Sequence, residues 1–233
     1  MRLDRYLANQ GIGTRKEVKK LIRQGQIMVN GVIQWKDDCK IDEETAVVSC
    51  NGEILHYQKY IYILMNKEPG FVCANQDSLH PTVFDCLPPA YQQCSTVGRL
   101  DKDTSGLLLI TNDGVLAHRL LSPVHHVEKG YEAVLRLPID QKQTELLQKE
   151  MDLGDFITMP AKVKVLDENR IHLYICEGKF HQVKRMLQAV GNEVIRLNRF
   201  SFGPLQLDDD LPQGEWRLLT NDEIALLKEV ANR

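Results

Sequence analysis

The chain lacks any apolar run approaching the ~18 consecutive residues that a membrane-spanning helix needs. Its first five residues, Met1 to Arg5, include three charged side chains, and no apolar stretch follows them. This pattern argues against a secretory signal peptide. Together the two absences predict a cytoplasmic protein without a membrane partner.

The chain also lacks cysteines spaced to hold zinc. None of its six cysteines forms a C-x-x-C pair, and their spacings match no common zinc pattern. His125 and His126 precede Glu128, but adjacent residues of a strand point to opposite sides, and the H-E-x-x-H spacing of a helical zinc site is missing. We therefore expect reduced thiols and no metal site.

An overall excess of positive charge is missing too, because the formal net charge of the 233 residues is -3. Locally the balance differs: residues 1–24 carry seven basic and two acidic side chains, a net charge of +5. Arg15, Lys19 and Arg23 recur every four residues on one helix stripe, where like charges repel by a few tenths of a kcal/mol per pair. A solvated basic face is one interpretation. The scarcity of acids favours the other, which is contact with the phosphates of a nucleic acid. The predicted RNA-binding residues of this stripe are Arg15, Lys16, Lys19, Lys20 and Arg23.

Residue patterns divide the chain into a small and a large unit. Residues 2–24 read as two short helices, and Thr14 with Glu17 forms the capping box of the second. Beyond Gly25 the apolar period changes to two, around the hairpin signal Asn30-Gly31. We expect an αα-β domain over residues 1–58, with a linker within residues 51–59.

From residue 59 to 233, short strands and helices are interspersed without the regular βαβ alternation of a doubly wound sheet. The pattern predicts an α+β domain with a mostly antiparallel sheet. Within it, the segment Gly98–Gly106 (GRLDKDTSG) places two aspartates on a glycine-bounded turn before an apolar strand. Residue types alone leave two interpretations open: Asp101 or Asp103 is a reactive carboxylate, or each merely stabilises the turn.

The segment Gly98–Gly106 resembles the signature of the RNA pseudouridine synthases, and the first 58 residues resemble an S4 RNA-binding domain. Four further motifs resemble this family and occur in its order along the chain. They are Met65–Gly70 (MNKEPG), His80–Val83 (HPTV), Ser122–Tyr131 (SPVHHVEKGY) and Glu177–Met186 (EGKFHQVKRM). The resemblance covers nearly the whole chain, and it is strongest to the subfamily that modifies 16S rRNA.

The resemblance implies a synthase fold with a mostly antiparallel mixed sheet flanked by helices. It also implies the site: Asp101 as the catalytic carboxylate, Tyr131 packing against the target base, and Lys184 pairing with Asp101. Arg99 matches a residue that holds the space of the flipped-out nucleotide. For an extruded base we further expect an apolar pocket at Met186 and Leu187.

Converting uridine to pseudouridine needs no redox step and no external group donor, so no cofactor is expected. The expected partner is 16S rRNA or a small-subunit assembly intermediate, bound by a monomer. Three alternatives stay open: a synthase acting on 23S rRNA, a non-catalytic S4-type RNA-binding or ribosome-assembly factor, and a glycoside hydrolase, which would need a second carboxylate.

Overall fold

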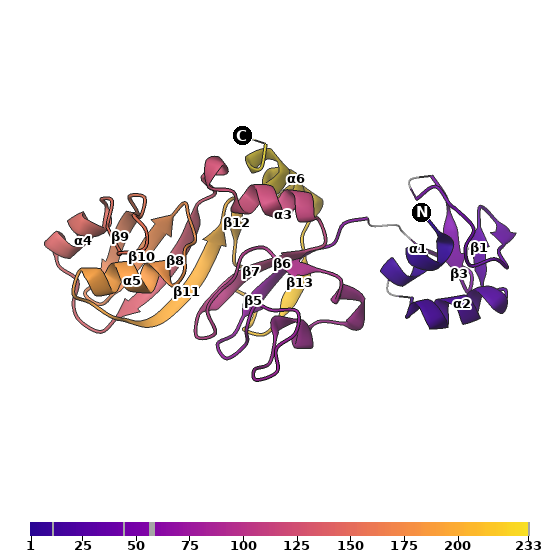
Figure 1. The fold of residues 1–233 in the computed structure, drawn as a ribbon, viewed down its shortest axis with the longest axis horizontal. Helices are drawn as coiled ribbons and strands as arrows, with labels where there is room; N and C mark the ends of the chain where they lie inside the picture. Colours follow the sequence, from indigo (N-terminus) through magenta and orange to yellow (C-terminus); the bar gives the residue numbers. More distant parts are fainter. Residues whose placement is uncertain (11, 44, 56–58, 233) are drawn as a thin grey trace. The chain divides into compact units, whose positions relative to one another are not determined.

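The computed structural model describes residues 1–10, 12–43, 45–55 and 59–232. The chain divides into two compact units, which are described separately (Figure 1). The first comprises Met1–Tyr60 and Leu87–Gln93, and the second comprises Ile61–Cys86 and Cys94–Arg233. The boundary predicted at residue 58 lies outside the described residues.

The first unit packs two helices on a small antiparallel sheet. Helix α1 spans Leu3–Asn9 and α2 spans Arg15–Arg23. The sheet has the order β2-β1-β3-β4, formed by β1 (Ile27–Val29), β2 (Val32–Ile33), β3 (Val48–Cys50) and β4 (Glu53–Leu55). The apolar faces of both helices meet the sheet in one core: Leu3, Tyr6, Leu7, Val18, Ile22, Ile27, Ile41 and Val48.

Local signals in this unit act as predicted, with one exception. Thr14 and Glu17 form the reciprocal capping box at the start of α2, and Asn30 and Gly31 turn β1 into β2 with positive φ. The first five residues of the linker expected within residues 51–59 form a turn and a strand instead. Asn51 and Gly52 form the turn that pairs β4 with β3, and residues 56–58 lie outside the described part.

The second unit is built on a mixed sheet with nine strands among the described residues. The central order is β13-β5-β7-β11-β8-β10-β9, while β6 pairs with β7 and β12 with β11. Their bounds are β5 Tyr62–Lys67, β6 Ser95–Thr96, β7 Ser105–Thr111, β8 Lys129–Leu135, β9 Lys162–Asp167, β10 Arg170–Ile175, β11 Val194–Phe202, β12 Leu205–Gln206 and β13 Trp216–Leu218.

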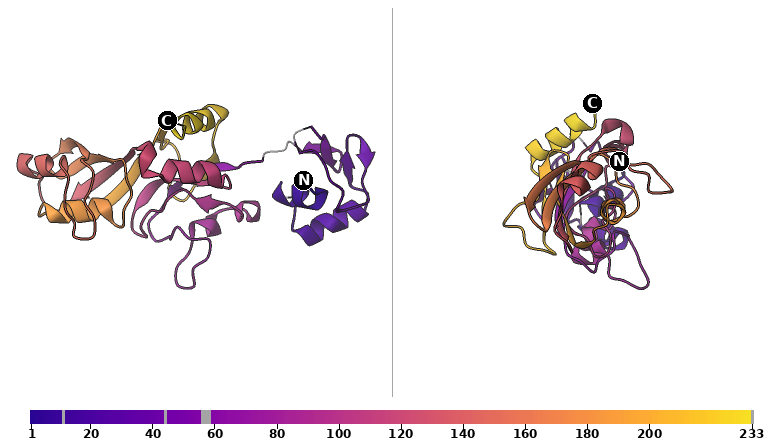
Figure 2. Two further views of the ribbon diagram at one scale, coloured as in Figure 1. Left: turned by 45° about the horizontal axis from the view of Figure 1, so that its top comes forward. Right: turned by 90° about the vertical axis from the view of Figure 1, so that its left-hand side faces the viewer.

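Helices flank this sheet. Helix α5 (Gln182–Ala189) packs on β11, α4 (Gln141–Leu147) on β9, and α3 (Gly114–Leu121) lies beside α6 (Asn221–Val230) (Figures 1 and 2). Short 3-10 helices span Val83–Cys86 and Pro123–His125 in this unit, and Pro89–Tyr91 in the first unit. In the described part of the chain, no helix combines the length and the apolarity needed to cross a bilayer.

Strands β7 and β11 run parallel and join the two halves of the sheet, whereas the other described strand pairs are antiparallel. The predicted α+β class with a mostly antiparallel sheet is therefore confirmed. The parallel junction depends on Gly106, whose φ is +103°. A Cβ at this position would lie 2.2 Å from the carbonyl oxygen of Arg199, so only glycine lets the two strands approach.

Candidate active site

The loop between β6 and β7 holds Asp101 through its backbone. The amide of Thr104 donates to the carbonyl of Asp101 at 3.1 Å, closing a turn. Beneath the turn lies Lys67, whose side chain is almost fully buried. Its Nζ donates to the carbonyls of Asp101 (3.1 Å) and Thr104 (2.8 Å), and also to those of Glu68 and Lys102. One buried ammonium thus satisfies several carbonyls that a tight loop would leave without donors.

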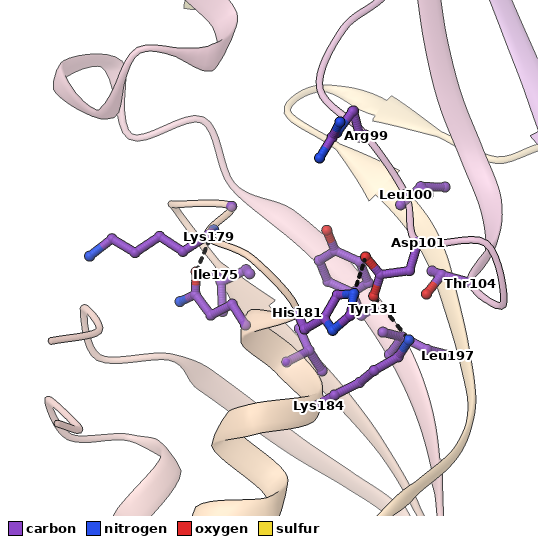
Figure 3. Close-up of a pocket in the computed structure, with 13 residues that line it drawn as sticks. Arg99, Leu100, Asp101, Thr104, Tyr131, Ile175, Lys179, His181, Lys184 and Leu197 are labelled. Carbon is purple, nitrogen blue, oxygen red and sulfur yellow. Dashed lines mark hydrogen bonds and ion pairs between the residues drawn. The ribbon is translucent and has the colours of Figure 1, made fainter. Parts of the chain in front are cut away.

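The carboxylate of Asp101 meets two side chains from the start of α5 (Figure 3). Lys184 Nζ lies 2.9 Å from Asp101 Oδ2, and His181 Nε2 lies 3.5 Å from Oδ1. His181 is the residue that precedes the first turn of α5, and its left-handed φ of +50° turns the chain into the helix. The side chain of Asp101 remains 26 % exposed, so its carboxylate is both held and accessible.

Lys184 also binds Asp103, with 2.6 Å between Nζ and Oδ1. Burial raises the pKa of Asp103, but its hydrogen bond to Lys184 and the lysine charge lower it more, so the net shift is downward. Burial lowers the pKa of Lys184, and the hydrogen bonds to Asp103 and Asp101 reverse this effect. Lys184 therefore bridges two carboxylates, and Asp103 does more than support the turn.

A pocket opens beside this cluster. Tyr131, which is 8 % exposed, lines it from β8, and Leu100, Ile175, Val183 and Leu197 supply apolar walls. Arg99 lies at the edge, apart from the Asp101 contacts; it is exposed and has no ion-pair partner among the described residues (Figure 3). Such a pocket can hold a planar aromatic group against Tyr131 with a carboxylate at its side.

Met186 and Leu187, the apolar residues expected in the pocket, are not at it. Both are fully buried on the core side of α5, and the helix instead presents Val183 to the pocket. Position along α5 decides this: Val183, Met186 and Leu187 lie three or four residues apart and share one helix face, and only the first turn, with Val183, reaches the pocket.

Comparisons with known proteins identify the family to which this fold belongs. The model of the RNA pseudouridylate synthase family matches residues 61–189, which include Asp101, Tyr131 and Lys184. The chain belongs to the RNA pseudouridylate synthase family. It is an enzyme that isomerises uridine to pseudouridine, and the S4 domain model matches its residues 1–34.

Full-length relatives support the assignment of the synthase. An uncharacterized RNA pseudouridine synthase of Bacillus subtilis (strain 168), YtzG, is 44 % identical, covering 98 % of this chain and 99 % of the relative. Ribosomal small subunit pseudouridine synthase A of Escherichia coli (strain K12) is 39 % identical, covering 97 % and 99 %. A crystal structure of a pseudouridylate synthase matches with a TM-score of 0.69 and 38 % identity, covering 97 % of this chain and 99 % of that one.

The basic stripe of this synthase lies on α2, in the first unit. Arg15, Lys16, Lys20 and Arg23 are exposed, and Arg15 and Lys16 line a surface hollow together with residues of α1. Lys19 differs, because its Nζ pairs with Asp37 Oδ2 at 3.0 Å. This ion pair relieves part of the like-charge repulsion along the stripe.

Sequence reasoning missed two contacts of this cluster, that of His181 with Asp101 and that of Lys184 with Asp103. A signal for His181 was present, since it lies three positions before Lys184 and three-residue spacing places side chains on one helix face. No comparable signal joined Asp103 to Lys184, because the two residues are 81 positions apart.

Proposed function

We propose that this synthase converts a uridine of 16S rRNA into pseudouridine, with Asp101 as the catalytic residue. The observation that carries the proposal is a partly exposed carboxylate, paired with Lys184, at the side of a pocket lined by Tyr131. The small-subunit target is supported by relatives named ribosomal small subunit pseudouridine synthase A. In this proposal residues 1–58 bind the rRNA, free or in a small-subunit assembly intermediate, and residues 59–233 carry the reaction.

The chemistry requires a bond exchange at one sugar carbon. The N1–C1′ bond of the uridine breaks, the uracil turns, and a C5–C1′ bond forms. The hydrogen on C5 leaves as a proton and N1 gains a proton, so atoms balance without an oxidant or a donor. An ionised Asp101 serves either route into this exchange, by attacking the sugar or by removing a sugar proton.

The neighbours of Asp101 have separate roles in this proposal. Lys184 orients the carboxylate through their ion pair, while Tyr131 packs against the uracil once the base has left its stack. The apolar walls favour the extruded base over water. Arg99 is exposed at the edge of the pocket, where it faces the RNA strand from which the base departs.

Modification mapping in a strain that lacks the gene tests the proposal. We expect one 16S rRNA pseudouridine to be missing, to return with the wild-type protein, and to stay missing with Asp101→Asn. The variant Asp210→Asn, which removes an exposed carboxylate from another loop, should restore the modification. Purified Asp101→Asn should bind target RNA with wild-type affinity in fluorescence anisotropy, because the catalytic step alone is removed.

Each other outcome has a distinct meaning. A missing modification in 23S rRNA would show that 23S rRNA, not 16S rRNA, is the substrate. Full rescue by Asp101→Asn would show that the reaction does not need the Asp101 carboxylate. Release of free uracil would indicate glycosidic cleavage without reattachment.

A further inference from the structure

Two buried cationic side chains line a hollow together with Asp101, and the reaction proposed above does not use them. Lys129 is 5 % exposed and Arg199 is 3 % exposed. Both line a hollow that also includes Asp101 and Tyr131. Their combined charge is close to a reacting centre whose substrate is a polyanion.

The sheet register brings these two cations together. Lys129 precedes Tyr131 by two positions on β8, so their side chains share one face of the strand. Arg199 on β11 pairs with Tyr131, and Phe202 pairs with Lys129. A bulge between Arg199 and Ser201 shifts the alternation. As a result both cations lie over the ring of Phe202, at 5.6 Å for Lys129 and 5.2 Å for Arg199.

Neither cation has a carboxylate partner within ion-pair distance in the described part of the chain. Arg199 donates from Nε to the carbonyl of Leu107 at 2.8 Å, while its buried Nη2 makes no hydrogen bond among these residues. Lys129 donates a single long hydrogen bond, 3.3 Å, to the carbonyl of Cys176. Two residues that line the hollow thus keep unused hydrogen-bond donors among the described residues.

The electrostatics of this pair are unfavourable without an anion. Burial, and then the charge of Arg199, lower the pKa of Lys129 to about 8. Cys176 and Glu177 act weakly in the other direction. Glu177 does not pair with Lys129, because its carboxylate already binds Lys179 at 3.3 Å and Gln182 at 2.6 Å. Buried charges without a partner destabilise a fold unless a ligand compensates them.

We propose that Lys129 and Arg199 form an anion subsite that takes a backbone phosphate adjoining the reacting uridine. The inference rests on the proposed function, because the phosphate is the charged group of RNA nearest a ribose placed at Asp101. A guanidinium edge and an ammonium suit phosphate oxygens as hydrogen-bond acceptors. Contact with the phosphate fixes the ribose relative to Asp101 without reading the base. It also supplies binding energy that offsets extrusion of the base.

Inorganic phosphate provides a test that needs no RNA. At constant ionic strength set with chloride, phosphate should raise the Tm of the wild-type protein by mass action. The Tm of Lys129→Met and Arg199→Met should not respond. The control Lys142→Met, which removes an exposed lysine of α4, should respond like the wild type. Lys129→Met should also be at least as stable as the wild type without phosphate, because it removes a buried uncompensated charge.

A neutral RNA backbone gives the second test. A target hairpin with a methylphosphonate next to the reacting uridine should lower kcat/KM of the wild type about 10- to 100-fold, the range of a charge-assisted hydrogen bond. Lys129→Met should show a similar loss with ordinary RNA and little further loss with the neutral RNA. Arg199→Met, which loses a backbone contact as well, serves as a second variant whose folding is checked by its Tm.

The results separate the two proposals. An unchanged wild-type Tm in phosphate, or equal methylphosphonate losses in the wild type and Lys129→Met, would overturn the subsite. If phosphate raises the wild-type Tm through Lys129 but no 16S rRNA uridine is modified, the subsite stands and the proposed target fails.

Discussion

At the scale of single residues, the site depends on one ammonium between two carboxylates. Lys184 lies 2.9 Å from Asp101 and 2.6 Å from Asp103, and His181 adds a further contact to Asp101. Because Lys184 is only 26 % exposed, its hydrogen bonds are partly shielded from water and hold the reacting carboxylate in one orientation.

We predict that Lys184→Met lowers kcat, measured at saturating RNA, about 10- to 100-fold, the effect expected when a charged hydrogen-bond partner is removed. Lys184→Arg should retain most activity, because a guanidinium also donates to two carboxylates. As a control, Lys142→Met removes an exposed lysine away from the pocket and should match the wild type. Wild-type kcat in Lys184→Met would show that Asp101 needs no cationic partner.

At the scale of secondary-structure elements, the parallel pairing of β7 and β11 positions the residues of the site relative to one another. It joins the strand that follows the Asp101 loop to the strand that presents Arg199. Strand β8 then adds Tyr131 and Lys129 on the far side of β11. Elements that are distant in the chain thus form one continuous surface, and its geometry depends on close strand approach at Gly106.

We predict that Gly106→Ala destabilises the protein by about 3 kcal/mol or more, because it adds a backbone collision to an unfavourable positive φ. Urea unfolding measures the change. The control Gly114→Ala, on α3 with open space around its Cα and no positive φ, should stay within about 1 kcal/mol of the wild type. Equal unfolding midpoints for the two variants would mean that the junction tolerates a side chain.

At the scale of the whole molecule, charge is distributed unequally between the two units. The net charge of the chain is -3, while residues 1–24 are strongly positive. The α2 stripe presents exposed cations, whereas the second unit places cations inside its hollow. This division suits one unit to hold RNA loosely and the other to position a single nucleotide.

We predict that the double variant Arg15→Gln/Lys16→Gln weakens RNA binding and leaves kcat at saturating RNA unchanged. The slope of log K against log salt should fall by about 1.5, since each lost phosphate contact removes about 0.7 to 0.9. Fluorescence anisotropy across a salt series measures this slope. The control Lys142→Gln/Lys228→Gln removes two exposed lysines of α4 and α6 and should keep it. A lower kcat in the stripe variant would contradict the division of roles.

Local residue patterns alone predicted much of this protein. Three of these patterns each involve only a few neighbouring residues, so they can be recognised from the sequence alone. They are the capping box of Thr14, the hairpin at Asn30-Gly31 and the strand after Asp101. Ordered motifs likewise indicated the family, and the resemblance, not the turn itself, selected Asp101 over Asp103 as the expected catalytic carboxylate.

Only the tertiary structure decided which distant residues meet. Lys184 reaches Asp103 across 81 positions, the bulge in β11 brings Arg199 beside Lys129, and the packing of α5 buries Met186 away from the pocket. Periodicity shows which residues share a face of a strand or helix. It does not show which element packs against that face, because packing and strand register are settled by the whole core at once.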